Sequence, residues 1–165
     1  MKRREVVGRI ASAAAIVAVP RALWALVPNA ARGREGESHS PAPLPITVYK
    51  SATCGCCTAW VKHMTQSGFV VTVKNVDDVD QIAEQMRVPK ALWACHTAVT
   101  GRYVISGHVP GDLVRQLLRE APSQVAGIGV PGMPAGSPGM ESPTPERYQV
   151  IEWRRDGSTR VYASR

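Results

Sequence analysis

Three cysteines stand within four residues of this 165-residue chain, in the sequence Cys54-Gly55-Cys56-Cys57. They follow a strand-like stretch at 46–51 and open a stretch with helical spacing, from about Cys56 to Ser67. The N-terminus of a helix offers free backbone amides and the positive end of the helix dipole, which favour the thiolate form of cysteine. This feature therefore predicts a β-α unit that presents sulfur chemistry at its turn.

The rest of the chain after residue 46 alternates strand and helix patterns. Two segments repeat apolar residues at helical spacing, and a third helix is predicted with Pro110 in its first turn. Gly101-Arg102 is a pair suited to a two-residue type II′ hairpin, and Asp156-Gly157 marks another hairpin. The predicted strands are 46–51, 69–76, 94–100, 103–108 and the two arms of the last hairpin, and the first two helices cover 56–67 and about 79–86.

The predicted order β-α-β-α-β-β-α, followed by an extra C-terminal β-hairpin, is the thioredoxin or glutaredoxin-like α/β arrangement. The stretch after Pro122 contains two Pro-Gly-Met triplets, at 131–133 and 138–140, and is expected to form a loop. At 44% hydrophobic residues, the chain can bury one core. We therefore expect one folded domain over residues 46–162.

Residues 1–31 have the layout of an export signal, with a basic start, an Ala/Val-rich middle and small residues near Ala30 and Ala31. Arg3-Arg4 followed by Val6-Val7 resembles a twin-arginine signal, so we expect a periplasmic protein, with the segment cleaved. A short N-terminal anchor helix is the alternative, although Arg9, Pro20 and Arg21 interrupt the run. Residues 32–45 are polar, contain proline and are expected to form a linker.

The net charge of +7 does not indicate a nucleic-acid surface. Five of the 20 basic residues but only one of the 13 acidic residues precede residue 32. Without this segment the chain keeps fifteen basic and twelve acidic residues, with no basic helix or aromatic platform. Nucleic acid is not expected as a partner, and no stable membrane span is expected once the signal is removed.

The fourth cysteine, Cys95, lies at the start of the predicted third strand, which should run antiparallel to the first. Cys95 should then lie against the turn, so that Cys54, Cys56, Cys57 and Cys95 form one site. Four thiolates suit Cu(I), Zn(II) or an iron–sulfur cluster. Adjacent Cys56 and Cys57 would strain a tetrahedral zinc site, whereas Cu(I) accepts low coordination and bridging thiolates, which favours a polynuclear copper site. A pair of structural disulfides is the alternative.

Four strings carry a resemblance to a known family: CGCCTAWVKHM, VPKALWACHTA, ISGHVP and VPGMPAGSPGM, in that order. With them, residues 46–162 resemble the CopG-like family of periplasmic copper-resistance proteins. The resemblance implies a thioredoxin-like fold, copper bound by Cys54, Cys56, Cys57 and Cys95, and a role in copper handling or redox interconversion. This sequence departs from the family at Ala94, the position before Cys95, where relatives usually have serine.

Two histidines are candidates for the same site. If Gly101-Arg102 form the hairpin tip, Cys95 and His108 face each other on one side of the sheet. His108 is then either an additional ligand or proton acceptor, or a cap on the strand end. His96 should point away unless the start of the strand is irregular. His63 is expected to be a surface or hydrogen-bonding residue.

Met133 and Met140 offer thioether sulfurs that suit Cu(I), because a Gly/Pro loop could lie across the site. The alternative is a packed surface loop in which methionine fills space. Met64 and Met86 belong to apolar helical stripes and are expected in the core.

The leading functional hypothesis is a copper-binding protein that sequesters or passes on Cu(I), with other periplasmic copper-handling proteins as partners. Whether it is also an enzyme, a copper oxidoreductase, stays open. A thiol-disulfide oxidoreductase that uses Cys54 and Cys57 is the second hypothesis, weakened by Cys56 and by the absence of proline before Cys95. A [2Fe–2S] carrier is the third, and zinc is a further metal alternative.

Overall fold

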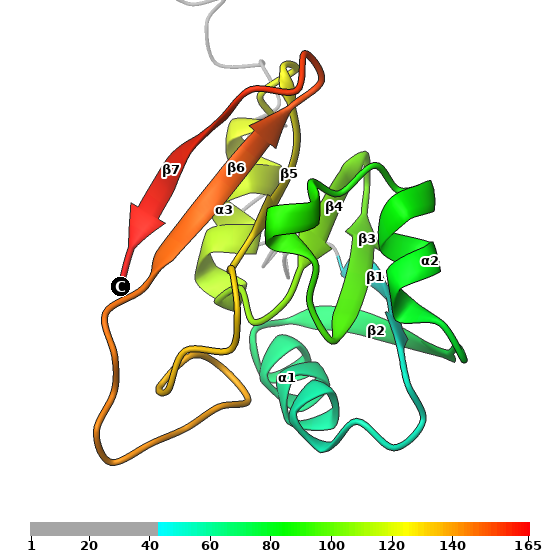
Figure 1. Ribbon diagram of the computed structural model, residues 1–165, viewed down its shortest axis with the longest axis vertical. Helices are drawn as coiled ribbons and strands as arrows, with labels where there is room; N and C mark the ends of the chain where they lie inside the picture. Colours follow the sequence, from blue (N-terminus) through cyan, green and yellow to red (C-terminus); the bar gives the residue numbers. More distant parts are fainter. Residues whose placement is uncertain (1–42) are drawn as a thin grey trace, which may run out of the picture. The chain divides into compact units, whose positions relative to one another are not determined.

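The computed structural model describes residues 43–165, which form a mixed α/β unit around one sheet (Figure 1). The seven strands lie in the order β2-β1-β3-β4-β5-β6-β7. In chain order the elements are β1 (Leu44–Lys50), α1 (Gly55–Gln66), β2 (Phe69–Asn75), α2 (Val79–Gln85), the 3-10 helix η2 (Lys90–Leu92), β3 (His96–Thr100), β4 (Tyr103–Ser106), α3 (Gly111–Glu120), β5 (Val125–Gly129), β6 (Gln149–Arg154) and β7 (Thr159–Ser164).

The α/β fold predicted from the sequence is confirmed. β1 pairs in parallel with β2 and antiparallel with β3. The C-terminal end of β1, the CGCC sequence that follows it and the start of β3 therefore meet at one end of these strands. The predicted signal at 1–31 lies outside the described residues, as does the predicted linker up to residue 42. The first strand begins two residues earlier than predicted, at Leu44, and the last strand continues to Ser164.

Local sequence explains the ends of the helices. Asp78 caps α2 by accepting a hydrogen bond from the Gln81 amide at 2.9 Å. The helix ends at Gln85, one residue before the predicted end at about 86, and Arg87 follows in a left-handed backbone with φ of 56°. Gly101, with φ of 56°, turns the β3–β4 hairpin as expected.

The sequence predicts neither the short η2 nor β5, and it assigns the residues of β5 to the loop after Pro122. The segment reads Val-Ala-Gly-Ile-Gly, and two glycines weaken any strand pattern. It becomes a strand through its neighbours, parallel to β4 and antiparallel to β6. Gly127 leaves room for the indole of Trp153, which contacts the position of its absent Cβ.

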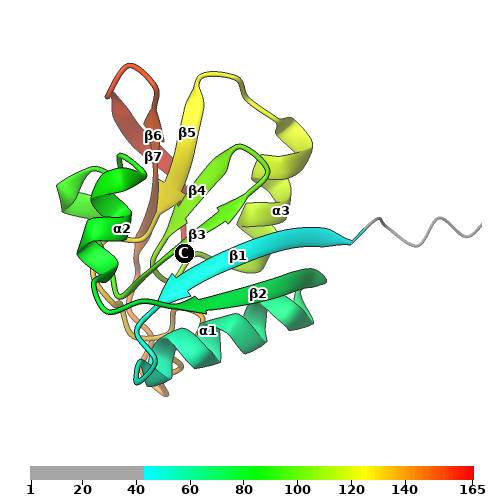
Figure 2. The ribbon, with the colours of Figure 1, turned by 90° about the vertical axis from the view of Figure 1, so that its right-hand side faces the viewer.

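Helices cover both faces of the sheet (Figure 2). α1 and α3 share the larger core, in which Trp60, Met64 and Leu117 are buried against Val48 and Ile105. Burial of each such side chain contributes about 1.5–3 kcal/mol. A smaller cluster on the other face joins α2 and η2 to β6. Within residues 43–165, no helix combines the length and apolarity that a membrane crossing needs.

Candidate metal centre

The turn between β1 and α1 presents the first three cysteines. Cys54 is the N-cap of α1, and its Sγ accepts a hydrogen bond from the Cys57 amide at 3.3 Å. Cys57 is fully buried, whereas Cys54 and Cys56 are half-buried. One free backbone amide of the first helical turn, that of Cys57, thus points at a cysteine sulfur, in line with the expectation from the sequence.

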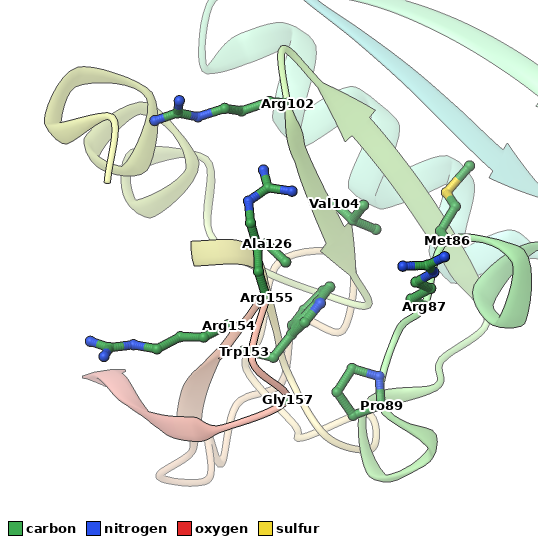
Figure 3. A pocket seen from close by; sticks show the side chains of 10 residues that line it. All are labelled: Met86, Arg87, Pro89, Arg102, Val104, Ala126, Trp153, Arg154, Arg155 and Gly157. Atoms are coloured by element: carbon green, nitrogen blue, oxygen red, sulfur yellow. The ribbon is translucent and has the colours of Figure 1, made fainter. Parts of the chain in front are cut away.

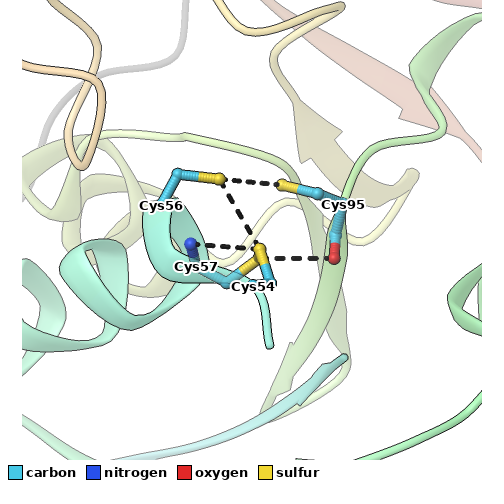
Figure 4. Close-up of side chains that lie close together, drawn as sticks. All are labelled: Cys54, Cys56, Cys57 and Cys95. Carbon is cyan, nitrogen blue, oxygen red and sulfur yellow. Dashed lines mark hydrogen bonds between the residues drawn. A yellow bond between two sulfur atoms is a disulfide. The ribbon is translucent and has the colours of Figure 1, made fainter. Parts of the chain in front are cut away.

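Cys95 joins these three sulfurs from the start of β3 (Figure 4). The Sγ atoms of Cys56 and Cys95 lie 3.8 Å apart, and those of Cys54 and Cys56 lie 3.5 Å apart. All four sulfurs lie within 4.8 Å of one another. The expected convergence of the four cysteines is therefore present in the fold, although Cys95 follows the other three by 38 to 41 residues in the sequence.

The four cysteines are not chemically equivalent. Cys54 and Cys57 form a disulfide, while Cys56 and Cys95 are free thiols. A pair of structural disulfides, the alternative considered from the sequence, is therefore wrong for this structure. Reduction of the one disulfide takes two electrons and two protons and would supply all four thiols as ligands.

His108 lies beside Cys95, as the hairpin register predicts. Every β3–β4 pair keeps the predicted offset, for example Thr97 opposite Ser106. Nε2 of His108 lies 3.3 Å from Sγ of Cys95, and Nδ1 lies 2.8 Å from the carbonyl oxygen of Pro138. His108 is fully buried. A cap on the strand end, the alternative, does not describe this arrangement.

The expectation that His96 points away from the site is wrong. Its Nδ1 lies 3.5 Å from Sγ of Cys95, and its ring packs against Trp60 with 4.4 Å between ring centroids. Cys95 sits in a bend before β3, so the alternation of a regular strand does not separate the two side chains. Among the described residues, Nε2 of His96 is buried without a hydrogen-bond partner.

Burial dominates the electrostatics of this cluster. It lowers the pKa of His96 to about 3, with the neighbouring His108 as the second cause, and it also lowers the pKa of His108. Burial and then the charge and hydrogen bond of Cys56 raise the pKa of Cys95 to about 12. Both imidazoles are therefore neutral at pH 7, the form in which histidine binds metals.

The second Pro-Gly-Met triplet contacts the cluster through its backbone. Pro138 supplies the carbonyl that faces His108, and Gly139 packs against the first turn of α1. The side chain of Met140 is half-buried, whereas Met133 is 54% exposed in the first triplet. Sequence reasoning looked to the methionine sulfurs and missed the backbone contacts, although the repeated Pro-Gly pair was the available signal.

His63 lies outside the cluster and has the hydrogen-bonding role predicted for it. Its Nε2 accepts a hydrogen bond from the Gly111 amide at 2.9 Å, which joins α1 to the start of α3.

A separate hollow of about 360 Å³ lies on the face of the sheet that carries α2 (Figure 3). Trp153 and four arginines line it, namely Arg87, Arg102, Arg154 and Arg155. No cysteine or histidine is among its lining residues. The hollow is therefore distinct from the sulfur cluster, and Met86 supplies the one sulfur among its lining residues.

The donor set of the cluster fits a soft metal ion. Four cysteine sulfurs lie within contact of one another, and two neutral imidazoles flank Cys95. Thiolate and imidazole are ligands for Cu(I) and Zn(II), and no carboxylate belongs to either group of donors. Nδ1 of His96, 3.5 Å from Sγ of Cys95, is one more nitrogen at the cluster.

The fold and this cluster together define a mixed α/β protein with a cysteine-rich centre at a strand-to-helix turn. A family model described as a protein of unknown function, DUF411, matches residues 92–140. The matched residues include Cys95, His96, His108 and both Pro-Gly-Met triplets. No curated protein matches the chain.

Two solved structures are similar over almost their whole length. Both are described as copper resistance protein CopG, in Form 2 and Form 1, and each is 38% identical to this chain. The similarity covers 98% of each of those chains and 74% of this one, with TM-scores of 0.71 and 0.70. The chain therefore belongs to the CopG family of copper resistance proteins.

Proposed function

We propose that this protein handles copper, holding Cu(I) through Cys54, Cys56, Cys57 and Cys95 in a polynuclear site once the Cys54–Cys57 disulfide is reduced. The observation that carries the proposal is the convergence of four sulfurs within 4.8 Å. Sulfurs this close suit thiolates that bridge several Cu(I) ions. Membership of the CopG family supports copper over zinc or a [2Fe–2S] cluster.

His108 is the first candidate for an additional donor, since its Nε2 faces the Cys95 sulfur at 3.3 Å. His96 is the second, with Nδ1 at 3.5 Å from the same sulfur. Met140 lies in the loop that reaches the site, and Met133 is the weakest candidate because of its exposure.

The Cys54–Cys57 pair also supports redox interconversion of copper at this site. Two Cu(II) ions would take one electron each from two thiolates, which yields two Cu(I) ions and the disulfide. The return of the disulfide to two thiols needs two electrons and two protons, supplied by two external thiols or by another two-electron donor. Such a step would make the protein a copper oxidoreductase as well as a copper binder.

The proposed location is the periplasm, with residues 1–31 as an export signal of twin-arginine type and the residues between this signal and β1 as a linker. This rests on the sequence of the N-terminal segment. A copper carrier there would exchange metal with other copper-handling proteins.

A thiol-disulfide oxidoreductase is the second candidate function, favoured by the disulfide of a C-x-x-C pair at a helix N-terminus. Two features count against it. Cys56 lies between the two cysteines, and Ala94 precedes Cys95 where thioredoxins have proline.

The test is an anaerobic titration of the reduced protein with Cu(I) against a competing chelator, with bound metal counted by mass spectrometry. We expect several coppers per chain, with fewer bound by Cys95→Ala and weaker binding by His108→Ala. Thr53→Ala is the matched control, because Thr53 is exposed beside Cys54 but outside the sulfur cluster.

Three results would contradict the copper proposal. Weak uptake together with rapid reduction of insulin would favour the oxidoreductase. A brown protein with visible absorption would favour iron–sulfur chemistry. Preferential retention of zinc in the presence of Cu(I) would favour a zinc site.

A further inference from the structure

The two Pro-Gly-Met triplets of the C-terminal loop differ in what they touch. In the second triplet, a Cβ on Gly139 would lie 2.7 Å from the Cys56 carbonyl oxygen and 2.9 Å from the Trp60 amide nitrogen. Those are backbone atoms of α1 and cannot move aside. In the first triplet, a Cβ on Gly132 would meet nothing within 4 Å. Of these two glycines, only Gly139 must lack a side chain for the loop to pack against α1.

Gly139 therefore seats the loop directly on the helix turn that carries the cysteines. The loop around it is held by its own hydrogen bonds. The Met140 amide donates to the Ser137 carbonyl at 2.8 Å, and the Gly139 amide donates to the Glu141 carboxylate at 2.8 Å. Ser137 is buried and bonds the Pro134 carbonyl at 2.7 Å. The seated loop has one defined shape.

That shape places the Pro138 carbonyl 2.8 Å from Nδ1 of His108. A carbonyl oxygen only accepts hydrogen bonds, so Nδ1 carries the ring proton. In a neutral imidazole Nε2 then has a free lone pair, and it is this atom that faces Sγ of Cys95 at 3.3 Å. Since His108 is fully buried, water does not compete for Nδ1.

We propose that Gly139 is a positioning residue: by seating the second triplet on α1 it holds the Pro138 carbonyl against His108 and selects the tautomer that presents Nε2 to the sulfur cluster. The consequence for metal binding rests on the proposed function, whereas the tautomer of His108 is a property of the metal-free protein. Partners that orient a metal-binding histidine typically change affinity by about tenfold to a hundredfold.

The test compares Gly139→Ala with Gly132→Ala. Both glycines have a positive φ, of 86° and 70°, within identical triplets, so an alanine is strained at both positions, whereas only the one at position 139 meets α1. The tautomer is read from long-range proton–nitrogen spectra of the full, metal-free chain labelled with 15N-histidine, with His108→Ala assigning the signal.

We expect the Nδ1-protonated tautomer in wild type and in Gly132→Ala, and a shift toward the Nε2-protonated form in Gly139→Ala. After reduction, Gly139→Ala should bind Cu(I) about tenfold or more weakly than wild type. Combining it with His108→Ala should add no further loss, because both act through the same nitrogen.

An unchanged tautomer in folded Gly139→Ala would overturn the proposal, as would independent losses in the double variant. If Gly139→Ala fails to fold, Glu141→Ala replaces it, since it releases the Gly139 amide from an exposed side chain. It must shift the tautomer in the same direction, and an unchanged tautomer there overturns the proposal equally. Tautomers as expected in a protein that binds no copper would uphold the positioning role and refute the proposed function alone.

Discussion

At the scale of single residues, Cys95 connects the two halves of the candidate site. Its sulfur lies 3.8 Å from that of Cys56 and 3.3 Å from Nε2 of His108. Burial disfavours its thiolate, and Cys56 adds to the effect, so the pKa of Cys95 rises to about 12. A metal ion would have to displace this proton, which makes copper uptake pH-dependent.

The raised pKa of Cys95 predicts slow alkylation of its thiol while the Cys54–Cys57 disulfide is intact. At pH 8 iodoacetamide should modify Cys95 at least about tenfold more slowly than a free cysteine, because little thiolate is present. The rate should keep rising with pH well above 9. Cys56→Ser should speed the reaction by lowering the pKa of Cys95, and peptide mass spectrometry follows each site.

Thr53→Ala serves as the control for this experiment and should leave the rate profile unchanged. A rate for Cys95 that levels off near pH 9, as for an ordinary thiol, would show that burial does not raise its pKa.

At the scale of elements, α1 is held at both ends by contacts that bear on the site. Its N-terminus receives the loop at Gly139, and its last turn receives α3 through the hydrogen bond from the Gly111 amide to Nε2 of His63. Burial lowers the pKa of His63, although Glu141 and Asp112 act in the opposite direction. Only the neutral ring accepts this hydrogen bond.

The contact between α1 and α3 should therefore weaken in acid. An unfolded histidine has a pKa of about 6.5, and the folded state binds the proton less readily. The contribution of His63 to stability is complete above about pH 6.5 and is lost as the pH falls through the lowered pKa of the folded state. His63→Gln should lack this part of the pH dependence, and His63→Ala should cost about 1 kcal/mol at pH 7.

Urea unfolding between pH 7.5 and pH 5 measures these differences. His96 and His108 remain in all the variants, so only the difference from wild type reports on His63. Stability curves of wild type and His63→Gln that run parallel across this range would contradict the assignment.

At the scale of the whole molecule, the candidate site draws on segments far apart in the chain. It needs the turn before α1, the start of β3, the residue two positions after β4 and the loop after β5. A ligand that binds only when all of these are in place stabilises the complete fold.

Copper should therefore raise the melting temperature of the reduced protein. With free Cu(I) at a hundred times the dissociation constant, the gain is about 2.7 kcal/mol per site, or a rise on the order of 10 °C. Differential scanning calorimetry under anaerobic conditions measures it. The protein with an intact Cys54–Cys57 disulfide should show a smaller rise, and equal rises in both forms would contradict the four-thiolate ligand set.

The sequence alone determined the features that depend on neighbours along the chain. Strand and helix periods, the glycine at the hairpin tip and the C-x-x-C spacing are all local. Together with the hairpin register they placed Cys95 against both the CGCC turn and His108, since pairing in a short hairpin follows from its turn.

Only the tertiary structure decided the rest. β5 has a poor strand pattern and forms because β4 and β6 supply its hydrogen bonds. His96 reaches the cluster because Cys95 sits in a bend rather than in the regular strand. The ring of His108 is oriented by a hydrogen bond to the backbone oxygen of Pro138. Because every residue has a backbone oxygen, no residue type in the sequence indicates this contact. Which carbonyl meets which imidazole depends on how distant segments pack, and residue identity alone does not encode that.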